Sequence, residues 1–447
     1  MSGERGLDCR YVMGVTLFAC LTLGGGTVRG LLVDSLLEAG IILAATYTII
    51  RQRTSSGSAL GLAGLVVLSS TGLLQVIPLP AVLFEGLRPG IYLPGLPEFA
   101  QYEAVSTISL STDRTLPALG FALCAFYLFF ALSKMPKGDL HGVIPFFLAG
   151  VGVNLAVVLL TYAGSGGAGN PGFLGFERGA GLFANDNHLS ALLCASIPLI
   201  AYLGVCRRRP RFAIMAILLI LLSLLAIGSR AGILTGVSVL LVSFLLLVWR
   251  TRTGGFVALG MIIVTTIYGY GAFARIEIDD IEAVLDRSDF ALTTLRALRE
   301  NWVLGTGYGS FDLVYPHYER LDDVYPMFVN HAHNDFLEIA LEGGLIGMIG
   351  LAAYLVAVLL RLRSIGRAPL QLAAVLSVCV VLVHSAVDYP LRTMAMAAAF
   401  VFFNALFFSR PESEETTSPE TGDRWAEPTA AATIRPVIQQ SISEGTS

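Results

Sequence analysis

The chain has 447 residues, of which 55% are hydrophobic and 14% are charged. With a mean hydropathy of +0.71, this composition excludes an ordinary soluble protein and indicates a polytopic membrane protein. The formal net charge is −4, and no basic patch is interleaved with aromatic residues, so no nucleic-acid partner is expected. The six cysteines lie in apolar segments or at basic ends without a CxxC pair, which predicts neither disulfides nor a zinc site.

Apolar runs of about 20 residues, the length that crosses a bilayer as a helix, recur along the chain. They predict an all-α protein with about twelve transmembrane helices, the first of them an uncleaved span rather than a signal peptide. The predicted spans are residues 11–28, 31–50, 59–77, 116–133, 141–162, 188–206, 212–228, 231–249, 254–273, 336–360, 370–387 and 393–409.

Lysine and arginine gather in every second connection between these spans, as at Arg51, Lys134, Arg207 and Arg361. Short loops rich in these residues stay on the cytoplasmic side of a membrane. The pattern therefore predicts that both termini are cytoplasmic. The regular alternation also supports twelve spans, since one missed span would break it.

Three longer loops fall on the opposite side, at residues 78–115, 163–187 and 274–335. The last is the largest, and its pattern predicts two short helices at 281–301 and 311–322 around the sequence GTGYGS. This GxGxG follows no strand, so turn glycines are favoured over a dinucleotide site.

Two domains are predicted, a membrane domain at residues 1–410 and a tail at residues 411–447. The tail is rich in Glu, Thr, Ser and Pro and has little apolar surface to bury, so we expect it to be disordered in the cytoplasm. No internal repeat is evident, which argues against a transporter built from inverted halves.

The stretch NHAHNDFLEIALEGGLIG at residues 330–347 joins the largest loop to the tenth span. Asp335 is expected to cap the new helix, with Glu338 as its capping-box partner. His333 and Asn334 would then lie beside a helix N-terminus, where free amides favour an anion. The alternative is an ordinary loop histidine beside a well-capped helix.

Other polar residues also gather at the outer ends of the spans, where charge is costly and usually signals function. The simpler alternatives are that Arg230 snorkels, that Asp388 pairs with Arg392 to close a turn, and that Asp186, Asn187 and Ser190 only cap a span. Together, however, these residues predict an outward-facing polar cavity. The candidates are Asp34, Glu38, Arg178, Asn185, Asp186, Asn187, His188, Arg230, Glu338, Glu342, His384, Asp388 and Arg392.

The residue types in this cavity suit one kind of chemistry. Arginine offers paired donors that match a phosphate or diphosphate, and histidine can accept a proton from a hydroxyl. No HExxH motif or nucleotide loop is present, and His331 and His333 could share a metal only from an irregular segment. The best match is metal-independent transfer of a group from a diphosphate carrier to a hydroxyl.

Five segments of the second half, in order, resemble the O-antigen ligase and O-antigen polymerase superfamily of bacterial inner-membrane glycan transferases. They lie between residues 181 and 408. They read GLFANDNHLSALL (181–193), GSRAGILTG (228–236), DRSDFALTTLRALRENWVLGTGYGSF (286–311), HAHNDFLEIALEGGLIG (331–347) and HSAVDYPLR (384–392).

The resemblance implies an enzyme that transfers a glycan from undecaprenyl diphosphate to an acceptor on the periplasmic face, without a cofactor. The acceptor would be lipid A-core in a ligase, the growing glycan in a polymerase and a protein hydroxyl in a related branch. The fold would be like that of the large lipid-carrier glycosyltransferases, in contact with membrane lipids.

The resemblance also assigns site residues. Arg230 matches the family's first functional arginine and His333 its histidine. Arg287 matches the second arginine best, with Arg296 and Arg299 as rivals. The residues expected to bind substrate are Arg296, Asn334, Asn187, His188, Arg178, Asp388, Arg392 and Glu338.

Ligase and polymerase stay open as alternatives at this point. A transporter or flippase for the same lipid-linked glycan is the contrasting class. A flippase needs polar residues along a path to both faces, whereas here they gather at one.

Overall fold

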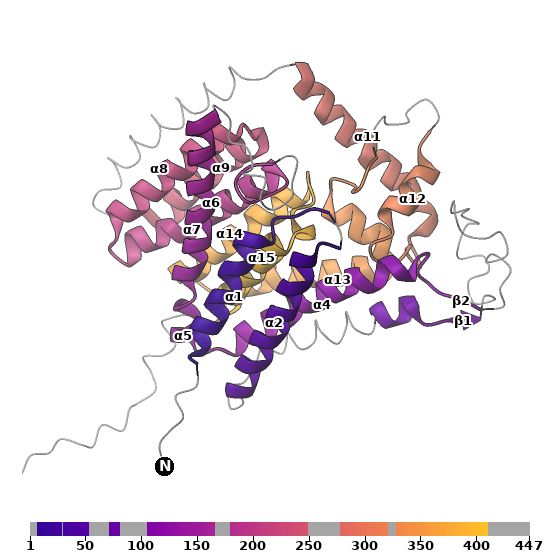
Figure 1. Ribbon diagram of the computed structural model, residues 1–447, viewed down its shortest axis with the longest axis horizontal. Coiled ribbons are helices and arrows are strands. Elements are labelled where there is room, and N and C mark those ends of the chain that lie inside the picture. The colour runs from indigo at the N-terminus through magenta and orange to yellow at the C-terminus, as the bar shows by residue number, and fades with distance from the viewer. Residues whose placement is uncertain are drawn as a thin grey trace, which may run out of the picture. The chain divides into compact units, whose positions relative to one another are not determined.

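The computed structural model describes residues 7–28, 30–52, 71–80, 105–165, 179–248, 278–320 and 328–409, which are almost wholly helical (Figure 1). The chain divides into two units, residues 1–410 and residues 411–447. The predicted disordered tail lies outside the described residues, and all of the described helices belong to the first unit.

The helices and strands follow one another in chain order (Figure 1). They are α1 (Cys9–Leu23), α2 (Leu32–Arg51), the paired strands β1 (Leu79–Pro80) and β2 (Val105–Ser106), α4 (Thr112–Lys134), α5 (Lys137–His141), α6 (Ile144–Ser165), α7 (Asp186–Cys206), α8 (Pro210–Ile227), α9 (Arg230–Ser243) with the π-helix η3 (Phe244–Val248), α11 (Ile278–Asn301), α12 (Phe311–Tyr318), α13 (Asp335–Ser364), α14 (Pro369–Ser385), the 3₁₀ turn η5 (Pro390–Arg392) and α15 (Met394–Phe408).

Seven helices in the described ranges are long and apolar enough to cross a membrane, and α1, α14 and α15 are shorter apolar helices. The prediction of an all-helical polytopic membrane protein is confirmed. Of the predicted spans, residues 254–273 and most of 59–77 lie outside the described residues. The total of twelve therefore remains a prediction.

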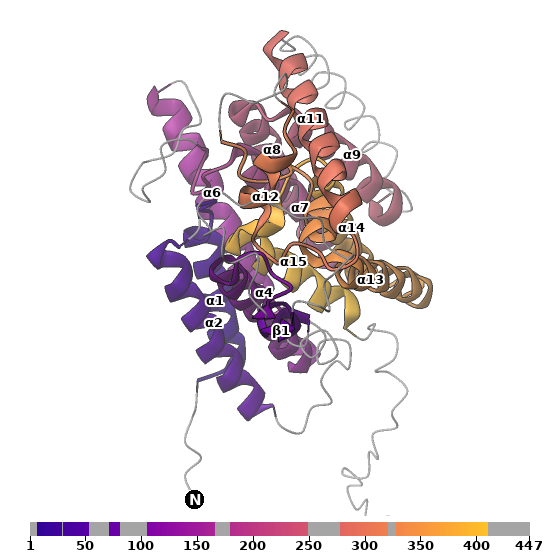
Figure 2. The same ribbon diagram turned by 90° about the vertical axis from the view of Figure 1, so that its right-hand side faces the viewer.

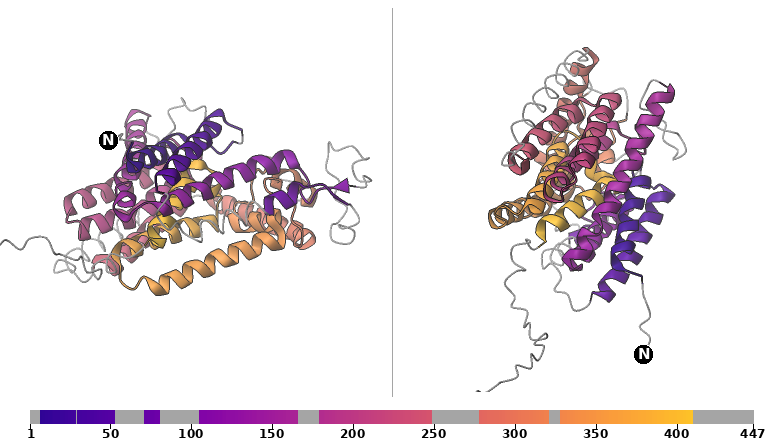
Figure 3. Two further views of the ribbon diagram at one scale, coloured as in Figure 1. Left: turned by 90° about the horizontal axis from the view of Figure 1, so that it is seen from below. Right: turned by 90° about the vertical axis from the view of Figure 1, so that its left-hand side faces the viewer.

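Helix α7 is the central helix of the bundle, and α13 lies at its edge. In the most apolar stretch of each helix, 83% of the residues are buried in α7 but 11% in α13, so α13 is left to face lipid. Helix α7 contacts α8, α9 and α14. Helix α13 lies on the side of the bundle away from α1 and α2 (Figures 2 and 3).

The corner between α8 and α9 shows why the sequence GSR occurs there. Gly228 ends α8 in the left-handed region, with φ of 79°, where glycine pays no steric cost. Ser229 then caps α9 by accepting a hydrogen bond from the backbone N–H of Gly232 at 3.1 Å. Arg230 is consequently fixed as the first residue of α9.

Helix α13 is broken at Gly344, whose φ of 57° and ψ of −148° are not helical. The break frees carbonyl groups, and the turn before α12 pairs with them: Thr306 N–H donates to Leu341 O and Gly307 N–H to Glu342 O, both at 3.0 Å. Beyond the break, Leu345 N–H donates to Val303 O. The prediction of a continuous tenth span is therefore wrong. Its initial segment is separated by the break and is hydrogen-bonded to the large loop.

The glycines of the GTGYGS sequence make this pairing possible. Gly305, Gly307 and Gly309 all have positive φ, and a Cβ on Gly305 would lie 2.4 Å from Glu342 O. The interpretation as turn glycines is confirmed. The two helices predicted on either side are also present as α11 and α12, with α12 ending four residues earlier than expected.

A buried amide fixes the loop that leads into α7. The side chain of Asn154, in α6, donates to Leu21 O at 3.0 Å and accepts from Leu182 N–H at 3.2 Å. Next to it, Ala184 N–H donates to Gly25 O at 3.0 Å. These bonds hold the first residues of α7 against the end of α1.

Candidate active site

His333 lies just before α13 in the left-handed backbone region, with φ of 48°. For a residue other than glycine this costs about 1–3 kcal/mol, and such strain persists where the surroundings enforce it, often at functional sites. Asn334 caps α13, its Oδ1 accepting from Leu337 N–H at 3.0 Å. The expectation that Asp335 caps this helix is wrong, because its carboxylate accepts from Ser385 Oγ at 2.7 Å instead.

Asp388, in the turn after α14, joins three segments that are far apart in the sequence. Its carboxylate is 1% exposed and accepts a hydrogen bond from Asn187 Nδ2 at 2.8 Å. The Nδ1 atom of His333 lies 3.4 Å from its Oδ1, and the Nε2 atom of His188 lies 3.7 Å from the same oxygen. We call Asn187, His188, His333 and Asp388 the aspartate centre.

The aspartate centre continues to the start of α9. Asn187 Oδ1 accepts a hydrogen bond from Ser229 Oγ at 2.8 Å, so one amide links Asp388 to the residue before Arg230. Asn185, not Asp186 or Asn187, caps α7, its Oδ1 accepting from Asn187 N–H at 2.8 Å. The simpler interpretation of Asn187 as a cap is therefore wrong, and its side chain is left for Asp388 and Ser229.

The histidine contacts in the aspartate centre are long. At 3.4 Å and 3.7 Å they are ion-pair distances, and within the described ranges His333 Nδ1 and both ring nitrogens of His188 lack a well-formed hydrogen bond. Catalytic hydrogen bonds are often long before substrate binds and shorten in the complex. The rings are thus held beside the carboxylate without being fully engaged by it.

The charge state of Asp388 follows from these neighbours. Burial by itself raises the pKa of this carboxyl, but His188 and His333 outweigh burial and hold the pKa well below its usual range. Asp388 is therefore ionised at neutral pH.

Tyr389 packs among three histidines next to the aspartate centre. Its ring centroid lies 4.2 Å from that of His331, 4.9 Å from that of His188 and 5.0 Å from that of His333. Burial, and then the charge of Asp388, raise the pKa of Tyr389. The phenol stays neutral and separates the aspartate centre from a second polar cluster.

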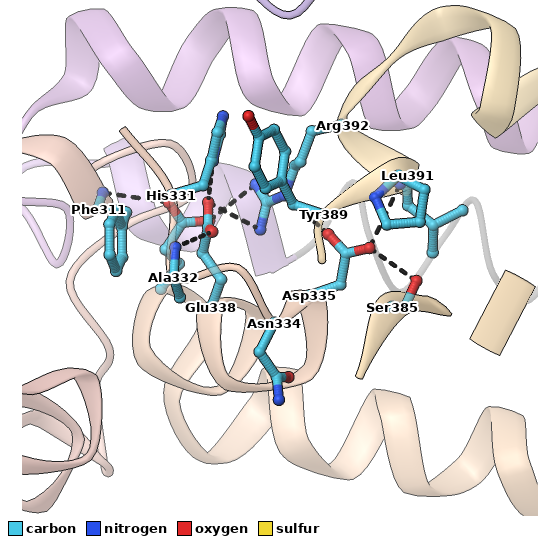
Figure 4. A network of polar contacts seen from close by, with 12 residues as sticks. Phe311, His331, Ala332, Asn334, Asp335, Glu338, Ser385, Tyr389, Leu391 and Arg392 are labelled. Carbon is cyan, nitrogen blue, oxygen red and sulfur yellow. Dashed lines mark hydrogen bonds and ion pairs between the residues drawn. The ribbon is translucent and has the colours of Figure 1, made fainter. Parts of the chain in front are cut away.

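That second cluster surrounds Arg392 (Figure 4). The guanidinium lies 3.1 Å from Glu342, 3.4 Å from Glu338 and 3.6 Å from Asp335, and all three carboxylates are buried. Burial alone would lower the pKa of Arg392, but these carboxylates raise it far above its ordinary value. Because Arg392 pairs with α13 rather than with Asp388, the proposed turn-closing pair is not formed.

Backbone groups and one histidine complete what we call the arginine cluster. His331 Nδ1 lies 2.8 Å from Glu338 Oε1, and Ala332 N–H donates to Glu338 Oε2 at 3.0 Å (Figure 4). Phe311 N–H donates to Glu342 Oε1 at 3.2 Å. The cluster therefore ties the initial segment of α13 to the last outer turn and to α12.

The rival arginines of α11 lie on different faces of that helix. Arg287 and Arg296 are nine residues apart, which places them about 180° apart around an α-helix. The guanidinium of Arg287 acts electrostatically on His384, next to the aspartate centre, whereas that of Arg296 acts on Tyr315 of α12. Arg299 is exposed. Of the three, Arg287 shares a face of α11 with Phe290, whose ring centroid lies 5.5 Å from that of His333.

The predicted site residues thus fall into groups. His333, Asn187, His188 and Asp388 come together, and Arg230 lies one residue from a contact of this centre. Asn334 donates to Ala386 O at 2.9 Å, which ties the start of α13 to the same turn. Glu338 and Arg392 belong to the arginine cluster, and Arg178 lies outside the described residues.

Two residues with important contacts escaped the sequence-based assignment, Tyr389 and Gln75. In the sequence, nothing distinguishes Tyr389 from other aromatic residues that lie at a membrane interface. Gln75 donates to Glu342 O and accepts from Tyr308 N–H, both at 3.1 Å. Gln75 could have been singled out from the sequence, because an amide inside a predicted apolar span needs a buried partner.

In the described ranges, no three His, Cys, Asp or Glu side chains are grouped as they would be to hold a metal ion. The chain matches no curated protein. Residues 214–352, from α8 into α13, match the model of the O-antigen ligase family. This match confirms the resemblance seen in the sequence over residues 214–352.

Proposed function

We propose that this protein transfers a glycan from undecaprenyl diphosphate to an acceptor hydroxyl at the periplasmic face of the inner membrane, as an O-antigen ligase does. The observation that carries the proposal is His333, held in a strained conformation 3.4 Å from the buried, ionised Asp388. A histidine paired in this way is suited to accept a proton from a hydroxyl.

In the reaction, the acceptor oxygen attacks the anomeric carbon of the donor sugar while its proton passes to His333. The bond between that carbon and the diphosphate oxygen breaks, and the electron pair leaves with undecaprenyl diphosphate. Attack opposite the leaving group inverts the anomeric configuration. Asp388 does not take the proton; it orients the ring and stabilises the imidazolium, as the carboxylate of a catalytic triad does.

Arg230 and Arg287 are the groups we propose for the diphosphate, whose charge grows as the bond breaks. Permanently charged, paired donors in a site shielded from water can contribute several kcal/mol at the transition state. Arg392 is a poor candidate for this task, because its guanidinium is already shared among three carboxylates. We assign it to positioning instead.

The location of the site on the periplasmic side rests on the direction of the helices. The aspartate centre is built from the first residues of α7 and α13 and from the turn after α14. The basic residues Arg207–Arg211 and Arg361–Arg363 lie at the opposite ends of α7 and α13. If these basic ends are cytoplasmic, as the distribution of lysine and arginine predicts, the centre faces the periplasm.

A deletion strain tests the proposal against its alternatives. Polymerised glycan that accumulates on its lipid carrier, with unmodified lipid A-core, supports a ligase. Acceptor that bears a single repeat would instead indicate a polymerase, and precursor trapped at the cytoplasmic face would indicate a flippase. Purified protein in proteoliposomes should then restore transfer from the lipid-linked donor.

A further inference from the structure

Helix α11 has an exposed apolar edge although it lies outside the predicted spans. Leu292 is 52% exposed, Leu295 40% and Trp302, directly after the helix, 49%. The opposite side of the same helix is buried, with Phe290 and Ala297 packed against α12 and the start of α13. The exposed leucines and tryptophan therefore belong to a helix whose other side is packed against the protein.

The exposed side of α11 carries a largely apolar strip and, beside it, a charged strip. At 100° per residue, Leu292, Leu295 and Trp302 fall within about 80° of one another. Asp289 and Glu300 follow on the adjacent part of the exposed side. On the same wheel the exposed Arg299 falls within the apolar arc. An apolar strip that includes one long cation able to snorkel fits a helix that lies in the plane of a membrane interface.

The apolar strip adjoins a surface that already faces lipid. Val303, next to Trp302, accepts the backbone hydrogen bond of Leu345 at 3.2 Å. Leu345, Ile346 and Ile349 are exposed on α13, a helix long and apolar enough to cross the membrane. The strip on α11 thus continues the lipid-facing side of α13 beyond the end of its span.

We propose that α11 is an interfacial helix whose edge of Leu292, Leu295 and Trp302 rests on the outer leaflet of the bilayer, at the boundary between headgroups and acyl chains. Tryptophan is enriched at this depth because its ring is apolar and its N–H is polar. Arg299, exposed within the same arc, can lay its stem along the strip and reach lipid phosphates with its guanidinium.

In this position, α11 would lie between the membrane surface and the aspartate centre. Phe290, on the buried side of α11, has its ring centroid 5.5 Å from that of His333. One side of the helix would therefore meet lipid while the other packs on the histidine. Quenching of tryptophan emission by lipid depends on membrane contact alone, so it tests this seating independently of the proposed reaction.

The experiment uses the full chain with Trp302 as its sole tryptophan, obtained with Trp249→Phe and Trp425→Phe. Proteoliposomes contain phosphatidylglycerol and phosphatidylethanolamine, with bromine placed either near the headgroup or near the chain end, and no glycan donor. We expect a roughly twofold loss of Trp302 emission with shallow bromines, a smaller loss with deep bromines and little quenching by aqueous iodide.

A matched control moves the probe to the charged strip, with Trp302→Phe and Glu300→Trp in the same background. Its emission should be quenched by iodide and not by brominated lipid. The proposal is overturned if Trp302 is quenched by iodide and not by bromine, which would place the strip in water. It is also overturned if neither reagent reaches Trp302, which would mean that protein covers the strip.

Discussion

The aspartate centre and the arginine cluster lie on the two sides of Tyr389 and share two segments, the start of α13 and the last outer turn. They differ in how completely their histidines are hydrogen-bonded. In the arginine cluster, two of the three Arg392 contacts are ion pairs at 3.4 Å and 3.6 Å, but His331 lies 2.8 Å from Glu338, which also accepts from a backbone N–H. In the aspartate centre, both histidine contacts to Asp388 are longer than a hydrogen bond.

This difference suggests a structural role for the arginine cluster and a catalytic role for the aspartate centre. A buried network in which the histidine and every carboxylate are hydrogen-bonded fixes one arrangement, and it is costly to disturb. A centre with incompletely engaged rings beside an ionised carboxylate can change its hydrogen bonds when a substrate arrives. We therefore expect the arginine cluster to determine whether the outer ends assemble, and the aspartate centre to determine whether the assembled protein transfers glycan.

The largest effect is expected from Asp388→Asn. The amide keeps the shape but loses the charge that orients His333, so transfer should fall by about 10²–10⁴-fold, as when general-base catalysis is removed. Insertion and thermal stability should change much less. Initial rates and melting curves of the purified variant make the comparison, and an equal loss of both would assign Asp388 a merely structural role.

Asp388 also makes a prediction about pH in the wild-type protein. Its pKa is lowered in the folded state, so its contribution to stability is complete above the pKa of the unfolded chain. That contribution is lost only as the pH falls through the lower, folded value. Unfolding profiles near neutral pH should therefore show no step from this carboxyl, and Asp388→Asn should destabilise most above the unfolded pKa.

Arg392→Met should act on the other cluster. It leaves three buried carboxylates without their cation, a loss of about 3–5 kcal/mol when one partner of a buried pair is removed. The expected result is a low yield of folded protein, with Arg392→Lys intermediate. If Arg392→Met inserts and melts normally but fails to transfer glycan, Arg392 contacts the substrate, as the sequence first suggested.

The two arginines on opposite faces of α11 provide a matched pair. Arg287→Ala should lower transfer by about 10²–10³-fold, the usual effect of removing one transition-state donor. Arg296→Ala should have a smaller effect, because its face is directed toward Tyr315. Rates measured with a lipid-diphosphate glycan decide between them, and the opposite ranking would move the diphosphate site to the other face of α11.

The smallest effect on chemistry is expected from Gly344→Ala, at the break in α13. A Cβ there would lie 2.5 Å from Gly305 N, and φ is positive, so the variant should lose about 1–3 kcal/mol of stability. Protein that survives should still transfer glycan. A normal melting temperature would mean that the break is not fixed by the turn around Gly305.

The sequence was most informative where a local rule decides the outcome. The predicted boundary between residues 228 and 231 matches the helix stop at Gly228 and the start at Arg230, and the glycines of GTGYGS form the predicted turn. The partners of charged residues were not predictable in the same way. Asp388 and Arg392 are four residues apart and looked like a pair, but the packing of α7 and α13 gives each of them other partners.

The break at Gly344 was missed for a related reason. Apolar residues continue through it without interruption, so the hydropathy pattern describes a single span. The break depends on backbone hydrogen bonds from the turn around Thr306, some 35 residues earlier, and no local pattern reports such a bond.

The most direct test is transfer in proteoliposomes from a lipid-diphosphate glycan, with a chelator present, by the wild type, His333→Ala and His331→Ala. We expect the wild type to stay active and His333→Ala to lose about 10²–10⁴-fold in rate while it still inserts and melts normally. His331→Ala, which alters the arginine cluster, should retain more activity but melt at a lower temperature. Full activity of His333→Ala would contradict the role of the aspartate centre, and loss of wild-type activity on chelation would contradict a metal-independent reaction.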